Sequence, residues 1–441
     1  SPDQDQWKYM GLVMRDIWGC TDYWDRSVSM EKKELRSALE KWINSLDTKL
    51  ENVLLLPPDF TRSNSGAGVI VQELYALLGS SAKIDIMPAL GCHVPMSDEE
   101  IDAMFGSEIP RELYIDHNWR TDVVKIGEVP AEFVSSISEG LINYSIDVEV
   151  NKRLLDPKYD LIVSIGQVVP HEVVGMANYT KNILVGCGGK SMIDKTHFLG
   201  AVYGMERLMG RDHSPVRQVF DYVEEHFLNE LPLQYILTVT TTKGDDTTIE
   251  GLFLGKSRQL FEEAVALSQE KNLDLLDEPL QQVVVYLDPY HFKSTWIGNK
   301  SIYRLRMAIA DNGELLIIAP GVKQFGEDPI IDKLIRKYGY FGTPHTLDMV
   351  ERNEDLRDSL SAAAHLIHGS SEGRFKIIYA AGHLTREETE GVGFDYMNID
   401  EAMARYDVTK MRDGFNVVNG EEVFYVSNPA LGLWALKDHV I

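Results

Sequence analysis

Short apolar runs alternate with amphipathic stretches along almost the whole chain. VLLLPPD (53–59) and DLIVSIGQVVPH (160–171) are typical of buried strands, because apolar residues follow one another there with few polar breaks. Other stretches have helical spacing, for example SRQLFEEAVALSQEKN at 257–272. Strands that alternate with helices are the pattern of parallel sheets covered by helices. The sequence therefore predicts an α/β fold.

The order of elements in the first half supports this interpretation. A helix over GAGVIVQELYALLGSS (66–81) is expected after the first strand, and a second strand is expected over KIDIMPALGCH (83–93). A further helix begins after Ser97, which forms a capping box with Glu100: the serine oxygen accepts the backbone N–H of the glutamate, and the glutamate reaches back. The start of that helix is well defined.

A second series of strands follows a charged, turn-prone stretch, NLDLLDEPLQQ. A domain boundary is therefore expected near 273–282, with an N-terminal domain over 1–275 and a C-terminal α/β domain over 276–441. We expect mainly parallel sheets flanked by helices in both, with the active site in the cleft between them. The strands predicted for the second domain are VVVYLDP (283–289), ELLIIAPG (314–321), FKIIYAAGH (375–383) and EVFYVSN (422–428).

The charge balance excludes some classes of partner. The chain has 43 Lys and Arg against 68 Asp and Glu, a formal net charge of −25. A surface this acidic repels polyphosphates, so nucleic acid is not expected as a partner. No apolar run is long enough for a membrane span, and SPDQDQWKYM at the N-terminus does not resemble a signal peptide. Three widely spaced cysteines imply no disulfide framework, so a cytoplasmic location is expected.

Polar residues follow three of the predicted strands, where an open parallel sheet has its ligand crevice. Asp59 and Arg62 come after the first strand, in PPDFTRSNSGAG, just before a helix whose N-terminus can hold an anion. His93 follows the second strand and His171 the third, and imidazoles suit acid–base chemistry near neutral pH. The alternative is structural: an ordinary helix cap with a surface ion pair, and histidines that are merely packed or exposed.

The segment from 166 to 200 is the densest in reactive side chains, with His171, Lys181 and His197. Its LVGCGGKS run resembles the end of a phosphate-binding P-loop, but Leu184 stands where that motif needs its first glycine. The two histidines are not spaced like the ligand pair of a zinc helix, and no CxxC or HExxH accompanies them. Nucleotide hydrolysis and a protein-only zinc site are therefore disfavoured, while a glycine-rich loop with incidental histidines stays open.

Taken in order, these segments resemble the motifs of the lactate racemase family, whose members carry a nickel-pincer nucleotide. DFTR (59–62) is similar to the family's D-H-T-R, and ALGCHVPMSDEE (89–100) to its G-x-H-R-P-x-x-x-E-E stretch. PHEVVGMANYTK (170–181) resembles P-H-x-x-x-G-x-x-x-x-x-K, and His197 follows Lys181 at the family's interval of sixteen. Each motif is a modest signal, but together and in order they are specific.

The resemblance implies how the cofactor would be held. Lys181 would bind it covalently through a thioamide, and His197 would be the one protein ligand to nickel. The other nickel bonds would come from the cofactor itself, which accounts for a metal site with a single protein ligand. Asp59, Thr61 and Arg62 would bind the cofactor, with Arg62 also binding anionic groups of the substrate.

The resemblance also implies how the substrate would be handled. His93 and His171 would be the paired acid–base residues, because each enantiomer presents its hydroxyl to a different side. The family's substrate-binding lysine corresponds to Lys300 in STWIGNKSIYRLRMAIA, where the motif has diverged: Trp296 and Ile297 replace the family's Tyr and Gln. Lys300 and Trp296 are expected to contact substrate, with an exposed helical lysine as the alternative.

Two further departures bear on the substrate. The family's lactate enzymes have Gly-Gly-Arg before the anchoring lysine, where this chain has Asn178, Tyr179 and Thr180. The Arg after the family's catalytic His is Val94 here. With the pocket altered and its polar lining changed by Asn178, Tyr179 and Trp296, we expect a hydroxy acid other than lactate, such as an aldonic acid.

The predicted function is therefore inversion of the C2 centre of a 2-hydroxy acid by proton-coupled hydride transfer to a nickel-pincer nucleotide. Expected partners are the small acid and the cofactor-synthesis proteins, without which recombinant protein would lack cofactor; a homo-oligomer is compatible with the sequence. Two alternatives stay open. One is a hydrolase or hydratase that uses a conventional divalent metal, and the other is a non-catalytic relative that binds a sugar acid.

Overall fold

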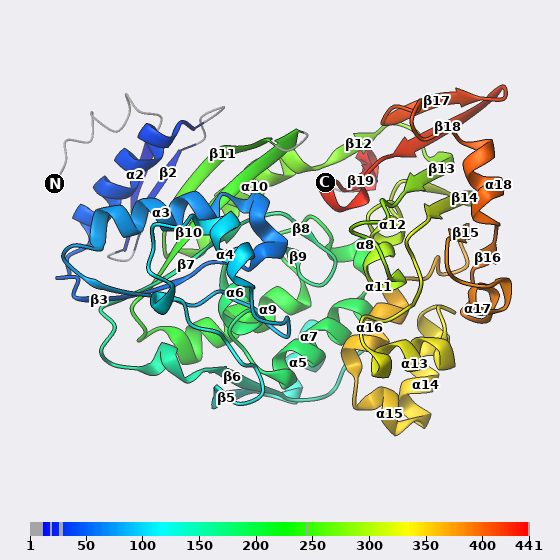
Figure 1. Cartoon of the computed structure of the whole chain (residues 1–441). Helices are drawn as coiled ribbons and strands as arrows, with labels where there is room; N and C mark the ends of the chain where they lie inside the picture. The colour runs from blue at the N-terminus through cyan, green and yellow to red at the C-terminus, as the bar shows by residue number, and fades with distance from the viewer. Residues whose placement is uncertain (1–11, 18–19, 26–29, 244–245, 440–441) are drawn as a thin grey trace. The chain divides into compact units, whose positions relative to one another are not determined.

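The computed structural model describes residues 12–17, 20–25, 30–243 and 246–439 (Figure 1). The N-terminal stretch SPDQDQWKYM lies outside the described residues. The chain divides into two units: the first contains residues 1–196 and 209–272, and the second contains 197–208 and 273–441. Both units combine helices with parallel-rich sheets, which confirms the predicted α/β class.

Among the described residues, the first unit is built on a seven-stranded sheet in the order β1-β2-β11-β10-β7-β3-β4. The neighbours β10, β7, β3 and β4 run parallel, and β11, β2 and β1 extend the sheet with antiparallel pairs. The first predicted strand is β3, which ends at Leu56 because Pro57 and Pro58 lack the N–H that a ladder needs. The strands are β1 Leu12–Ile17, β2 Cys20–Asp25, β3 Asn52–Leu56, β4 Lys83–Ile86, β7 Leu161–Gln167, β10 Leu233–Lys243 and β11 Asp246–Gly255.

Helices cover the faces of this sheet. Side chains alternate along β3, so Val53 and Leu55 join the core beneath α2, α3 and α4, while Leu54 is buried on the other face. The predicted capping box is present at α4: Ser97 Oγ accepts the N–H of Glu100 at 3.1 Å, and the glutamate carboxylate accepts the N–H of the serine at 2.9 Å. The larger helices are α2 Lys32–Ser45, α3 Ala67–Leu78, α4 Asp98–Phe105, α7 Lys190–Tyr203, α9 Pro215–Val223 and α10 Arg258–Asn272.

Shorter elements complete the first unit. β5 and β6 form an antiparallel pair, and β8 pairs with β9 in a small hairpin just beyond β7. A π-helical turn, η4, continues α9. Their bounds are η1 Phe60–Ser65, η2 Arg111–Leu113, β5 Val123–Val129, α5 Ala131–Ile137, β6 Ile146–Asn151, η3 Lys152–Leu155, β8 Pro170–His171, β9 Gly175–Met176, α6 Thr180–Leu184 and η4 Glu224–Leu228.

The second predicted strand is shorter than expected. The sequence predicted a strand over 83–93, but β4 ends at Ile86. Pro88 cannot donate to a ladder, and Gly91 has a φ of 57°, so the chain turns away from the strand direction. The result is a loop, rather than a strand end, that carries His93.

The second unit has its own sheet, in the order β16-β15-β14-β13-β18-β17 within the described chain. All its pairs are parallel except β17 with β18. β14 begins at Ile309, before the predicted start at Glu314, because the chain bends at Asn312 (φ 64°) and the ladder continues across the bend. The strands of this sheet are β13 Leu280–Tyr286, β14 Ile309–Ala319, β15 Lys376–Ala381, β16 Asp395–Tyr396, β17 Gly414–Val418 and β18 Glu421–Val426. A separate parallel pair is formed by β12 Asp274–Leu276 and β19 Trp434–Leu436.

Helices surround this second sheet, and a buried cluster under α18 joins its central strands. In the part of the chain that the structure describes, no helix is both long and apolar enough to cross a membrane. The helices are α8 Met205–Leu208, α11 Thr295–Gly298, α12 Lys300–Tyr303, α13 Pro329–Tyr338, α14 Thr343–Arg352, α15 Glu354–Arg357, α16 Leu360–His368, α17 Arg386–Gly391, α18 Ile399–Arg405, η5 Pro429–Leu431 and η6 Lys437–His439.

Candidate functional site

Three loops follow the carboxyl ends of neighbouring parallel strands in the first unit. β3 lies between β4 and β7; the chain passes from β3 to β4 on one side, whereas β7 leads to β10 on the other. Such a reversal is a topological switch point, where open α/β sheets bind their ligands. The predicted site residues Asp59, Thr61 and Arg62 follow β3, His93 follows β4, and His171 follows β7.

Asp59 is the buried centre of the first loop. Its Oδ2 lies 2.7 Å from Nδ1 of His93, and its Oδ1 accepts both the backbone N–H of Thr61 at 3.2 Å and the threonine hydroxyl. Burial alone would raise the pKa of this carboxyl, but the hydrogen bonds from His93 and Thr61 hold the pKa below its ordinary value. Asp59 is therefore a carboxylate that orients the His93 ring, whose side chain is 54% exposed.

Arg62 lies in η1, between β3 and α3. Its backbone N–H donates to the carbonyl of Asp59 at 3.0 Å. The turn is fixed to the sheet by the hydroxyls of Thr238 and Thr240 on β10, which donate to η1 carbonyls at 2.6 and 3.0 Å. These bonds hold η1 beyond the sheet edge, so the position of Arg62 is set by two strands that are distant in sequence.

His171 lies in the small β8–β9 hairpin and is 8% exposed. Its Nδ1 accepts the backbone N–H of Val173 at 3.1 Å, and the Glu172 carboxylate lies 3.9 Å from the same nitrogen. The N–H of Val173 requires a lone pair on Nδ1, so the hydrogen of the neutral ring is on Nε2. His171 and His93 therefore differ in which ring nitrogen carries the hydrogen, because Nδ1 of His93 faces a carboxylate instead.

Lys181 follows an unusual stretch of backbone. Asn178 and Tyr179 precede it with φ values of 67° and 57°, a region that side chains other than glycine rarely adopt. Lys181 itself is partly exposed, and it lies in the first turn of α6. Burial by its surroundings lowers the pKa of the Lys181 amine to about 8, and the positive charge of Arg62 acts in the same direction.

The electrostatic partners of Lys181 come from all three loops. Arg62 follows β3, Glu172 adjoins His171 beyond β7, and Cys92 adjoins His93 beyond β4; the two acidic groups oppose the lowering of the lysine pKa. A side-chain amide next to Lys181 also joins α6 to two of these strands. Asn182, next to Lys181, donates from Nδ2 to the carbonyl of Leu56 at the end of β3 and to the Ser164 hydroxyl on β7, both at 2.9 Å. The structure thus brings Asp59, Arg62, His93, His171 and Lys181 to one edge of one sheet.

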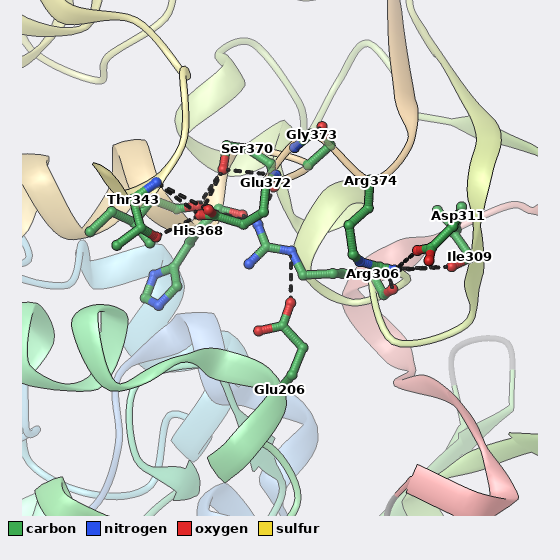
Figure 2. A network of polar contacts seen from close by, with 12 residues as sticks. Glu206, Arg306, Ile309, Asp311, Thr343, His368, Ser370, Glu372, Gly373 and Arg374 are labelled. Carbon is green, nitrogen blue, oxygen red and sulfur yellow. Dashed lines mark hydrogen bonds and ion pairs between the residues drawn. The ribbon is translucent and has the colours of Figure 1, made fainter. Parts of the chain in front are cut away.

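His197 lies further along α7, and the contact pattern of the chain groups it with the second unit. The predicted convergence of His197 with Lys181 therefore stays a prediction. The segment 197–208 is held within the second unit by Arg306, whose Nε lies 3.5 Å from a Glu206 carboxylate oxygen. Figure 2 shows this pair. The same guanidinium donates to the carbonyls of Ile367, His368 and Ser370, at and just after the end of α16.

Lys300 and Trp296 lie in the short helices α12 and α11 of the second unit, and both are partly exposed. Lys300 is thus helical and partly exposed, and its contact with substrate stays a prediction. The Trp296 ring packs on His365, with 4.2 Å between ring centroids, and His365 Nε2 lies 2.7 Å from the Tyr340 hydroxyl. Asn299, between the two predicted residues, is buried and accepts the Tyr379 hydroxyl at 3.0 Å.

Tyr179 corrects one expectation. We expected it to line the altered pocket, but it is 1% exposed and packs in the core, stacked on Phe261 at 5.0 Å and close to Tyr235 at 4.4 Å. Its hydroxyl donates to the carbonyl of Lys256 at 2.8 Å. The positive φ at 179 places this side chain in the core while the next turn carries Lys181.

Sequence reasoning missed Arg217 in α9, which is 1% exposed and contacts the segment before Lys181. A signal was available in SPVRQVF. Arg217 lies at helical spacing from Phe220 and between the buried Val216 and Val219, so a charge occupies the apolar face of a helix. A charge on such a face needs buried polar partners, which the sequence alone does not identify.

Across the described residues, no group of three or more His, Cys, Asp and Glu is arranged to hold a metal ion.

Comparison with known proteins finds a family likeness in the N-terminal part of the chain. Residues 24–207 match the family described as the lactate racemase N-terminal domain. This match covers less than half of the chain, and it lies over the motifs of residues 59–200, whose resemblance to the family it confirms.

Solved structures extend the likeness beyond the matched domain. A protein of known crystal structure from Thermotoga maritima has a TM-score of 0.78 and 22% identity, covering 93% of this chain and 100% of that chain. The lactate racemase apoprotein from Thermoanaerobacterium thermosaccharolyticum has a TM-score of 0.68 and 17% identity, covering 93% of each chain. At these identities the likeness shows the fold. No curated protein matches the chain.

Proposed function

We propose that the chain inverts the C2 centre of a 2-hydroxy acid by proton-coupled hydride transfer, with a nickel-pincer nucleotide held covalently at Lys181. The observation that carries the proposal is the state of the Lys181 amine, which is partly exposed and has a pKa of about 8. At neutral pH its neutral fraction is roughly two-hundredfold larger than that of an ordinary lysine with a pKa of about 10.4. The neutral amine is the nucleophilic form, which covalent attachment requires.

The surrounding residues fit an anionic nucleotide. Arg62 supplies a guanidinium within electrostatic reach of Lys181. At the start of α3 the first backbone N–H, that of Ala67, already donates to Ser65 Oγ at 3.1 Å, so the anion-binding group of this loop is the Arg62 guanidinium. Asp59, Thr61 and Arg62 would hold the nucleotide, and His197 would be the protein ligand to nickel. When bound, the group supplies a carbon that accepts hydride from C2 of the substrate.

The two histidines would move the hydroxyl proton of the substrate. In the neutral ring, Nδ1 of His93 carries the hydrogen toward Asp59, so Nε2 has the lone pair that can take a hydroxyl proton. Nε2 of His171 carries the hydrogen instead, so this ring can donate to a substrate oxygen. The carboxylate of Asp59 stabilises the imidazolium that forms on His93. For His171 to return a proton to the substrate, the ring would first have to be an imidazolium, with Nδ1 released from the Val173 N–H and turned toward the Glu172 carboxylate 3.9 Å away; giving up the Nε2 proton then leaves a neutral ring. Inversion in the opposite sense uses the same two rings with their protonation states exchanged.

The substrate we propose is a hydroxy acid longer or more polar than lactate, such as an aldonic acid. With Tyr179 in the core, the support for this choice is Val94, which is 82% exposed beside His93, and Trp296 with Lys300 in the second unit. Arg62 and Lys300 would bind its carboxylate. We also propose a cytoplasmic location and loading by the cofactor-synthesis proteins.

The test is to coexpress the chain with the cofactor-synthesis proteins and to measure intact mass and racemisation. We expect a mass increase that is absent from Lys181→Ala, and inversion of an aldonic acid faster than of lactate by chiral chromatography. Lys83→Ala, at an exposed lysine of β4, is the matched control and should keep both. A Lys181→Ala protein that carries the adduct or turns over substrate would contradict the proposal.

A further inference from the structure

The backbone that precedes Lys181 is held by one buried side chain. Arg217 Nη2 donates to the carbonyl of Met176 at 2.7 Å and to that of Asn178 at 3.2 Å, and Nη1 donates to the Thr180 hydroxyl at 2.9 Å. The three acceptors span residues 176–180, which is the stretch with two consecutive positive φ values. A planar guanidinium with five donors in a fixed fork can satisfy such a set, whereas an ammonium has no fixed fork.

Arg217 is itself held in place from behind. Its guanidinium lies 4.4 Å from the centroid of the Phe261 ring, a cation–π distance, and the same ring stacks on Tyr179. Its helix α9 starts at a cap that is tied to the same hairpin, because Ser214 Oγ donates to the carbonyl of Val174 at 2.9 Å and accepts the N–H of Arg217. Arg217 is thus fixed with respect to the segment whose conformation it determines.

Burying the Arg217 guanidinium costs desolvation free energy, which its hydrogen bonds must offset. Burial lowers the pKa of the Arg217 guanidinium to about 10. Asp221, the acidic group with the largest electrostatic effect on Arg217, pairs with Arg258 at 3.3 Å. The hydrogen bonds of Arg217 go to backbone and hydroxyl oxygens, so its contacts fix geometry rather than neutralise a partner charge.

We propose that Arg217 is a positioning residue, which fixes residues 176–180 in the strained conformation that presents the Lys181 amine to the three loops. Its three hydrogen bonds offset the strain of Asn178 and Tyr179. The role of Lys181 as an anchor rests on the proposed function, but the positioning itself is a property of the chain without cofactor. The two claims can therefore fail separately.

The test uses the full chain, purified without cofactor. Hydrogen exchange would follow the amides of Lys181 and Asn182, which donate to the carbonyls of Asn178 and Tyr179 at 3.2 and 3.1 Å. We expect both amides to exchange at least about tenfold faster in Arg217→Met, since charge-assisted hydrogen bonds are lost. Arg217→Lys keeps the charge without the fork, so it should leave the same two amides exposed.

A second measurement follows the reactivity of the Lys181 amine. The rate at which a small amine-acylating reagent modifies Lys181 is measured against pH by peptide mass spectrometry. Arg217→Met should shift the midpoint upward, because it removes a positive charge that lowers the Lys181 pKa, whereas Arg217→Lys should keep the midpoint. If the two amides exchange faster in both variants, but the pH midpoint of Lys181 modification shifts only in Arg217→Met, then the positioning effect is separate from the effect of the charge.

Two further variants keep the proposal falsifiable if Arg217→Met does not fold. Thr180→Val removes one acceptor without changing α9, and it should speed exchange of the same amides by a smaller factor. Arg258→Met is the matched control, because Arg258 also packs on Phe261, at 5.1 Å, but donates to the carbonyl of Asp212 instead of to the 176–180 segment. Unchanged exchange in Arg217→Lys and Thr180→Val, or an equal effect in Arg258→Met, would overturn the proposal.

Discussion

Lys181 shows what a single residue contributes to this site and what it costs the fold. Its spacing from His171 and His197 could be read from the sequence, and so could its likeness to an anchoring lysine. The state of its amine could not, because the pKa depends on burial and on charges that α6 brings together from three separate loops. A partly buried cation with a lowered pKa destabilises the folded chain whenever it is protonated.

This cost predicts how stability depends on pH. The folded-state pKa of Lys181 is about 8 against an ordinary 10.5, so the unfolded chain binds more protons between these values and stability rises with pH across that window. Lys181→Met should therefore be more stable than wild type at pH 7, by roughly 1–3 kcal/mol after allowance for partial exposure. The difference should vanish near pH 10.5.

Urea unfolding of the two proteins at pH 7, 9 and 10 measures this difference directly, since other titrations cancel between them. A variant that is less stable than wild type at neutral pH would show that the amine makes a net favourable interaction in the folded chain.

The loop from 176 to 181 is the element where sequence reasoning met its limit. The strands and the larger helices followed from apolar periodicity, and the α4 capping box followed from two residues three positions apart. The loop did not, because its shape depends on Arg217, which lies about forty residues further along the chain. The family's glycines at positions 178 and 179 could have indicated the positive φ values that Asn178 and Tyr179 adopt.

A pair of substitutions tests how tightly this loop packs on the sheet. Gly166 on β7 lies beneath the Asn178 side chain, and a Cβ there would be 2.0 Å from the asparagine Nδ2. Gly166→Ala should lower the free energy of unfolding by roughly 1–3 kcal/mol, as overpacking does. Adding Asn178→Gly should restore much of it, because glycine removes the clash and tolerates the positive φ.

Urea or thermal unfolding of the two single variants and the double variant gives the coupling between the positions. If Asn178→Gly does not raise the free energy of unfolding in the Gly166→Ala background, the asparagine side chain does not occupy the space that the structure assigns to it.

At the scale of the whole molecule, the chain leaves the first unit at position 197, returns at 209 and leaves again after 272. Composition and pattern predicted one crossing near 273–282, because that stretch is charged and rich in turn formers. The earlier excursion begins inside α7, where no helix end or turn marks position 197, so the pattern gave no sign of it. Long-range contacts such as Arg306 with Glu206 define it instead.

Arg306 is predicted to be the main polar support of that excursion. It is buried, and it donates to the carbonyls at the end of α16 while pairing with Glu206 (Figure 2). Arg306→Met should lower the free energy of unfolding by roughly 2–4 kcal/mol, because several carbonyls lose a charged donor.

The matched control is Arg386→Met, in an exposed pair with Glu390, which should change stability by less than about 0.5 kcal/mol. Urea unfolding combined with hydrogen exchange in α16 would locate the loss. If Arg306→Met and Arg386→Met lowered the free energy of unfolding equally, the buried Arg306 contacts would be no more stabilising than an exposed ion pair.

The early excursion has a practical consequence for anyone who wishes to study one half of the protein by itself. A truncated product ending at Asn272 would still carry residues 197–208, but it would lack Arg306 and the rest of their packing partners. Leu199, Met205 and Leu208, all buried in the intact chain, would then be open to water and prone to aggregation. A soluble N-terminal fragment would have to replace that dodecapeptide with a short polar linker, and in doing so it would give up His197.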